Sequence, residues 1–168
     1  MANPIVTFEM ENGIIKNVLP YDGHSVDHDY GNLRIVPGFM DIHCHGAYGF
    51  DTNDAHKEGL RAWTRNIPQE GVTSFLATTI TQSDDVLLKA VENVAAVMEE
   101  GYEGAELLGI HMEGPFLAQS FKGAQPEQYI VSPSVEQFKK FQTAAKGNIR
   151  YMTLATENDK NFELTDYC

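Results

Sequence analysis

An alternation of two kinds of segment runs through this chain from residue 38 onward and limits the folds it can adopt. Four apolar, β-branched segments are separated by segments with helical spacing of their apolar residues. The former are residues 39–43, 72–80, 105–111 and 149–155, and the latter are residues 55–69, 84–100 and 135–146. Strands that alternate with helices of this length form parallel βαβ units. The alternation therefore predicts an α/β fold with four parallel strands.

Polar residues follow each of these strands, at positions 43–45, 78–81, 111–113 and 156–157. Active sites lie at the carboxyl ends of the strands in a TIM (β/α)8 barrel, and ligands bind at the same ends of an open doubly wound sheet. A complete barrel needs about 250 residues and at least ~200. We therefore expect this chain to form a partial TIM (β/α)8 barrel of about four βα units.

The first 36 residues have a different pattern. Residues 5–8 and 13–18 are strand candidates joined by a turn signal at Asn12 and Gly13, and residues 33–36 return to β character. The chain is thus expected to contain an N-terminal β segment at 1–36 and the first half of a barrel at 37–168.

Composition excludes several classes of partner. The chain carries 24 acidic and 12 basic side chains, a net charge of −12, which disfavours both nucleic acid and anionic membrane surfaces. No apolar run reaches the ~18 residues of a membrane span, and the first residues lack the pattern of a signal peptide. The two cysteines, Cys44 and Cys168, lie far apart and indicate a reducing compartment. A cytoplasmic location is expected.

The sharpest local signal is the segment at residues 41–46, DIHCHG. His43 and His45 lie two residues apart on a strand and so share a face, whereas Cys44 points the other way and is interpreted as a packing residue. Two imidazoles on one face can converge on one metal ion, with Asp41 as a partner for an imidazole N–H. The alternative is that both histidines are partly buried and bonded to the backbone.

A second signal lies at residues 111–116, HMEGPF. A carboxylate directly after a buried strand is costly unless it is paired or bound to a metal, so Glu113 is a candidate ligand or catalytic group. A salt bridge at the mouth of a loop is the alternative. His111 has the same parity, and is a candidate ligand, a donor to substrate, or a core histidine.

The segment at residues 122–126, KGAQP, is a weaker signal. Its small residues permit close approach of a ligand, and Gln125 offers both a donor and an acceptor, although an ordinary surface turn has the same composition. Neither a GxGxxG nor a GxxxxGK[ST] pattern occurs, and there is no GxSxG elbow. A phosphate-loop enzyme and a serine hydrolase are therefore disfavoured.

In their order and spacing, four segments of the chain resemble the N-acetylglucosamine-6-phosphate deacetylases, a family of the amidohydrolase superfamily. These segments are PGFMDIHCHG at 37–46, GVTSFLATT at 71–79, HMEGPF at 111–116 and KGAQP at 122–126. The last two are specific to that family, whereas the His-x-His segment is shared across the superfamily. The resemblance covers residues 35–157.

The resemblance implies an N-terminal β segment that joins a small sandwich domain, followed by the barrel. It implies metal-dependent hydrolysis of the N-acetyl group of N-acetylglucosamine 6-phosphate, in amino-sugar catabolism. Glu113 would bind a divalent metal ion (Zn, Fe or Mn), and His43 and His45 would hold a second ion in members with two. Ala124 and Gln125 would contact the amino-sugar phosphate substrate. A homo-oligomer is expected.

The resemblance also predicts what lies elsewhere. The family is more than twice as long as this chain, and its later metal histidines and its acid/base aspartate follow strands beyond the fourth. The catalytic aspartate is therefore expected beyond residue 168, and the chain is similar to the N-terminal portion of a deacetylase. Two alternatives stay open: a related amidohydrolase such as an N-acetylgalactosamine-6-phosphate deacetylase, and an inactive truncated half barrel with a role in self-association.

Overall fold

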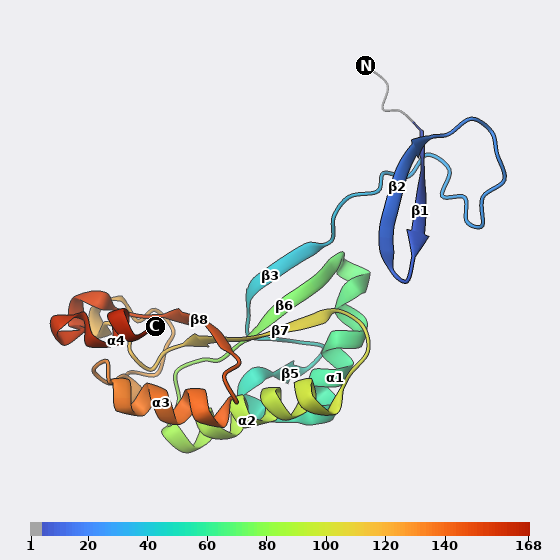
Figure 1. The fold of residues 1–168 in the computed structure, drawn as a ribbon. Helices are drawn as coiled ribbons and strands as arrows, with labels where there is room; N and C mark the ends of the chain where they lie inside the picture. The colour runs from blue at the N-terminus through green and yellow to red at the C-terminus, as the bar shows by residue number, and fades with distance from the viewer. Residues whose placement is uncertain (1–4) are drawn as a thin grey trace. The chain divides into compact units, whose positions relative to one another are not determined.

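A computed structural model describes residues 5–168, which fall into two compact units divided between Pro37 and Gly38. The first unit contains an antiparallel hairpin of β1 (Val6–Glu11) and β2 (Ile14–Pro20) (Figure 1). Asn12 and Gly13 form its turn with φ values of 51° and 75°, as a two-residue hairpin turn requires. The strand expected at residues 33–36 is absent. These residues pair with no strand of the described chain, and β propensity alone does not make a strand.

The second unit is built on a parallel sheet in the order β3-β6-β7-β8. Its strands are β3 (Phe39–Cys44), β6 (Val72–Thr78), β7 (Glu106–Glu113) and β8 (Ile149–Thr153). The register pairs Cys44 with Ala77, and Thr78 with His111. The carboxyl ends of the strands therefore meet at one edge of the sheet, and the predicted α/β fold with four parallel strands is confirmed.

Three helices lie against one face of this sheet (Figure 1). They are α1 (Lys57–Asn66), α2 (Asp84–Glu100) and α3 (Val135–Ala144). Trp63 of α1 packs on Phe75 of β6 with ring centroids 4.6 Å apart, and Val91 and Phe141 extend the same core. The helix expected to reach residue 69 ends at Asn66 and continues as a 3-10 turn, because Pro68 has no backbone N–H for the next α-helical hydrogen bond.

Short elements complete the second unit. A two-stranded ribbon of β4 (Gly46–Ala47) and β5 (Phe50–Asp51) follows β3 and leads into a 3-10 turn, Thr52–Asp54. The other 3-10 turns are Ile67–Glu70, Gln119–Phe121, Glu127–Tyr129, Thr156–Asn158 and Lys160–Phe162, and the last helix is α4 (Glu163–Tyr167).

The central and outer strands of the sheet differ in burial. Phe75 of β6 and Ile110 of β7 are fully buried, whereas Phe39 and Met40 of β3 are 65% and 62% exposed. Tyr151 of β8, the other outer strand, is also exposed. The outer strands thus present apolar side chains that the described residues leave uncovered. No helix within residues 5–168 combines the length and the apolar character needed to cross a membrane.

Candidate metal centre

Three side chains from the carboxyl edge of the sheet converge on one point. His43 lies in β3, His45 directly follows that strand, and Glu113 is the last residue of β7. The Nε2 atoms of His43 and His45 lie 2.7 and 3.1 Å from Oε2 of Glu113, and 3.3 Å from each other. The pairing of β3, β6 and β7 brings together residues 70 positions apart in the chain.

The 3.3 Å between the two histidine nitrogens fits a bound metal ion, whereas their 2.7 and 3.1 Å distances to Glu113 are those of hydrogen bonds or ion pairs. Ligand atoms held at about 2.0–2.1 Å in a tetrahedral arrangement lie about 3.3–3.4 Å apart, and the two histidine nitrogens meet that value. Two imidazole nitrogens and one carboxylate oxygen form a donor set that suits zinc, iron or manganese. The Glu113 side chain is only 17% exposed, and its carboxylate contacts these two neighbours.

Solvent reaches the cluster from the histidine side. The side chains of His43 and His45 are 50% and 33% exposed. An open hollow of about 390 Å³ lies beside His45 and is lined by residues of the β4–β5 ribbon and by Asp54.

Asp41 and Cys44 occupy structural positions around the histidine pair. The carboxylate of Asp41 accepts the backbone N–H of His43 at 3.0 Å, so the expected contact with an imidazole N–H is not formed. The Cys44 thiol donates to the carbonyl oxygen of Gly46 at 3.7 Å and packs against the core. Burial raises the pKa of the Cys44 thiol, which keeps it protonated. Its interpretation as a packing residue agrees with these contacts.

His111 lies in the core beneath the cluster. It is 2% exposed, and its ring lies 4.8 Å from that of His43 between centroids. Its Nδ1 bonds to the carbonyl oxygen of Ile42 at 2.9 Å, which requires a proton on that nitrogen, so Nε2 accepts from the hydroxyl of Thr153 at 2.8 Å. Burial lowers the pKa of His111 and favours this neutral form. Of its three candidate roles, the core histidine matches the structure.

The loop after β7 places its two predicted substrate residues differently. Ala124 is exposed, whereas Gln125 is 7% exposed and its Oε1 accepts the backbone N–H of Thr81 at 2.7 Å. Lys122 donates to the carbonyl oxygen of Gln125 at 3.3 Å. The carboxamide of Gln125 therefore links the loop after β7 to the segment after β6.

Two residues that were not predicted as site residues, Thr52 and Asn53, hold the loop after β3 in place. Thr52 binds the carbonyl oxygen of His45 through its N–H at 2.8 Å and its hydroxyl at 2.9 Å. The carboxamide of Asn53 forms two hydrogen bonds with the backbone of Ile80. The only sequence signal was a run of polar residues, DTND, directly after an aromatic residue.

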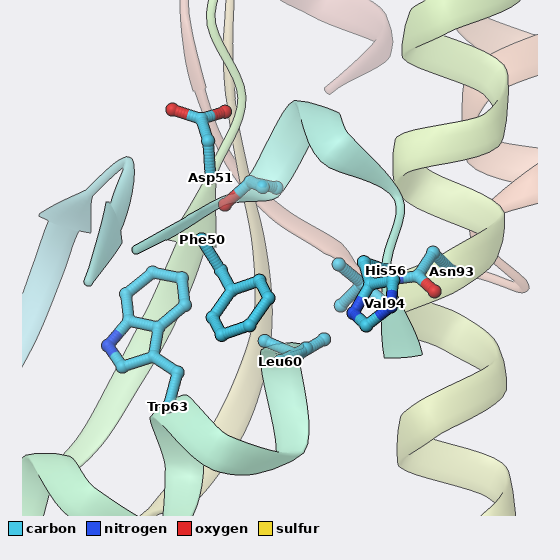
Figure 2. Close-up of a pocket in the computed structure, with 8 residues that line it drawn as sticks. Phe50, Asp51, His56, Leu60, Trp63, Asn93 and Val94 are labelled. Atoms are coloured by element: carbon cyan, nitrogen blue, oxygen red, sulfur yellow. The ribbon is translucent and has the colours of Figure 1, made fainter. Parts of the chain in front are cut away.

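A second cavity lies beneath the loop after β3, between side chains that pack together (Figure 2). It measures about 10 Å³, which is room for about one water molecule, and it lies among Phe50, His56, Leu60 and Trp63. Phe50 stacks on His56 with the ring planes 7° apart. This cavity is too small for a substrate, and its contacts anchor the base of the loop.

Comparisons with known proteins identify the family of the chain. The profile of the Amidohydrolase family matches residues 34–163. The N-acetylglucosamine-6-phosphate deacetylase of Bacillus subtilis is 49% identical over 133 residues, which cover 77% of this chain and 34% of that protein. The crystal structure of the Mycobacterium smegmatis N-acetyl-D-glucosamine-6-phosphate deacetylase superposes with a TM-score of 0.77 at 25% identity, covering 90% of this chain and 39% of that one.

A variant of the same mycobacterial protein was solved in complex with N-acetyl-D-glucosamine-6-phosphate. It superposes with a TM-score of 0.74 at 26% identity, over 86% of this chain and 37% of that one. The chain thus spans about a third to two fifths of the length of the relatives it matches.

Proposed function

The chain belongs to the amidohydrolase family, and from that premise we propose that it supplies the first part of a metal-dependent N-acetylglucosamine-6-phosphate deacetylase. The reaction would hydrolyse the N-acetyl group of N-acetylglucosamine 6-phosphate to give glucosamine 6-phosphate and acetate. The observation that carries this proposal is the convergence of His43, His45 and Glu113 at the carboxyl edge of a half barrel. The relatives with this name and the sugar-phosphate complex support the choice of substrate.

Glu113, His43 and His45 would hold one or two divalent ions, of zinc, iron or manganese. The chemistry that such an ion supplies is polarisation of the acetamide oxygen and a supply of hydroxide near neutral pH. Glu113 contributes the negative charge that attracts a cation, and its partial burial keeps that interaction strong. The neutral ring of His111 lies beside His43 without adding a competing positive charge.

Gln125 would bind the substrate as a hydrogen-bond donor. Its Oε1 is taken by the N–H of Thr81, an obligate donor, so only its NH2 group is left for a ligand. That group suits an acceptor such as a hydroxyl or phosphate oxygen of the sugar phosphate. Ala124 would contribute its main chain beside it, because a small exposed residue permits close approach.

The apolar side chains of the outer strands favour a second candidate role, self-association. Phe39 and Met40 on β3 and Tyr151 on β8 are more than half exposed, and the outer edges of both strands leave backbone groups unpaired within the described residues. A homo-oligomer would cover part of this surface. This role is compatible with the deacetylase and would remain if the chain were inactive.

An assay of acetate release tests the proposal. We define the extended protein as this chain followed by the carboxyl-terminal portion of the Bacillus relative beyond its match. The extended protein should release acetate from N-acetylglucosamine 6-phosphate after loading with Zn²⁺, Fe²⁺ or Mn²⁺, and should lose this activity on chelation. A folded, metal-loaded protein that leaves this substrate intact would refute the deacetylase, and faster turnover of N-acetylgalactosamine 6-phosphate would assign the other sugar.

A further inference from the structure

The loop after β3 is tied to the end of β6 by the side chain of Asn53. Its Nδ2 donates to the carbonyl oxygen of Ile80 at 2.8 Å, and its Oδ1 accepts the N–H of Ile80 at 3.0 Å. These two bonds have the pattern of a pair of main-chain hydrogen bonds between strands. They lie beyond Cys44 and Ala77, the last residues at which β3 and β6 pair. The carboxamide therefore continues the link between the two segments after the strands stop pairing.

Asn53 directly follows the residue that holds the main chain of His45. Thr52 is 5% exposed, and both its N–H and its hydroxyl bind the carbonyl oxygen of His45. The turn that carries Thr52 and Asn53 also packs through Phe50 on Leu60 and Trp63 of α1, and through His56 beside Asn93 and Val94 of α2 (Figure 2). Among the described residues, the side-chain hydrogen bonds that link this turn to the segment after β6 are those of Asn53.

The ring of His45 contacts Glu113 through Nε2 at 3.1 Å, but it has no orienting hydrogen bond at Nδ1. Its Nδ1 is buried and has no partner among residues 5–168. Ligating imidazoles are ordinarily oriented by a hydrogen bond at the nitrogen that faces away from the metal, and losing that bond weakens metal binding. Without this bond, the placement of the His45 ring depends on how firmly its main chain is held.

We infer that Asn53 is a positioning residue of the metal centre. It fixes the turn that holds the carbonyl oxygen of His45, and so sets where the His45 Nε2 atom lies relative to Glu113. The inference rests on the proposed metal centre, because it assigns a role toward the ion that His43, His45 and Glu113 would bind. It predicts that a residue without contact to the ion controls the affinity for it.

Titration of the 168-residue chain with Co²⁺ alone tests this role, read from the visible absorption of the bound ion. Asn53→Ala removes both bonds to Ile80, and Asn53→Asp keeps the size and the acceptor but sets an oxygen against the Ile80 carbonyl. Both variants should bind Co²⁺ roughly 10-fold more weakly, with a changed absorption band. Asn66→Ala is the matched control. The Asn66 carboxamide also donates to a backbone carbonyl, that of Ala62, but it lies before the amino end of β6, away from the metal centre.

Circular dichroism separates a positioning effect from a loss of structure. A variant with the spectrum of the unsubstituted chain and weaker Co²⁺ binding supports the inference. Co²⁺ affinity and absorption equal to those of the unsubstituted chain, in either folded variant, would overturn it and leave the metal centre standing. An unsubstituted chain that binds no Co²⁺ would overturn the metal centre and this inference together.

Discussion

A carboxylate at the end of a buried strand needs a positive or metal-bound neighbour, and the neighbours of Glu113 are two imidazoles. Both Nε2 atoms lie within 3.1 Å of the same carboxylate oxygen. No lysine or arginine forms an ion pair with Glu113 in the described chain. A neutral imidazole donates from one ring nitrogen and accepts at the other, and the nitrogen without a proton is the one that can bind a metal. The local chemistry therefore distinguishes this carboxylate from an ordinary surface ion pair.

Glu113→Gln should remove most metal binding from the chain. The substitution keeps the size of the side chain but takes away the negative charge from a set of three ligands. The loss of affinity should exceed the roughly 10–100-fold that changes in outer residues produce. Equilibrium dialysis against Zn²⁺ followed by elemental analysis gives the measurement. Glu106→Gln, at the exposed amino end of the same strand, is the control and should bind normally.

Gln125→Glu should raise KM of the extended protein for the sugar phosphate without changing its metal content. The carboxylate can still accept the N–H of Thr81, but it has no donor for the substrate. A lost hydrogen bond to a charged group corresponds to about 1.5–3 kcal/mol in kcat/KM. Steady-state acetate release gives the value. An unchanged kcat/KM would show that Gln125 only shapes the loop.

At the scale of elements, the residues at the ends of the strands and helices shape the loops around the site. Gly114 ends β7 with φ of 78°, and a Cβ there would lie 1.9 Å from Oγ1 of Thr81, so only glycine fits. Ser83 lies at the N-cap of α2 as expected, yet its side chain makes no capping bond. The sequence predicts that Gly114 ends a strand and that Ser83 begins a helix. The contacts of these residues depend on the neighbouring loops.

The short helix α4 depends on one acidic side chain. The carboxylate of Asp159 accepts the N–H groups of Leu164 and Thr165 and the hydroxyl of Thr165. Burial by itself would raise the pKa of Asp159, but these hydrogen bonds outweigh burial and hold the pKa below its usual value. Its ionised form is therefore the one that stabilises the fold.

Asp159→Ala should lower Tm at neutral pH, and the difference from the unsubstituted chain should shrink in acid. The stabilisation is complete above the ordinary carboxyl pKa of about 3.9 and is lost as the pH falls through the lower folded-state value. Thermal unfolding at a series of pH values checks this. Asp166→Ala, exposed on the same helix, should have little effect on Tm. A Tm difference independent of pH down to pH 2 would contradict the assigned role.

At the scale of the whole molecule, the sheet has an uneven distribution of burial. β6 and β7 are covered by helices on one face and flanked by strands on both sides, while β3 and β8 form its two edges. Exposed apolar residues on edge strands with unpaired backbone groups favour pairing with another chain. The relatives that share this fold are a little more than twice as long.

A protein made of these 168 residues alone should self-associate and should not catalyse deacetylation. Barrel active sites draw residues from several strands, and no aspartate joins the cluster of His43, His45 and Glu113 within residues 5–168. Size-exclusion chromatography and acetate release in the presence of Zn²⁺, Fe²⁺ or Mn²⁺ provide the measurements. A monomer that turns over substrate at about 1–10³ s⁻¹ would contradict this expectation.

The sequence by itself determined the local features of this protein: the helical and strand segments, the hairpin turn at Asn12 and Gly13, and the polar residues that follow each strand. These depend on side-chain periodicity and backbone preferences within a few residues, which the sequence states directly. Only the tertiary structure decided that Glu113 meets His43 and His45, that Asp41 bonds to a backbone N–H, and that Asn53 joins two loops. Such contacts depend on strand order and register, which arise from packing between segments that lie far apart in the chain.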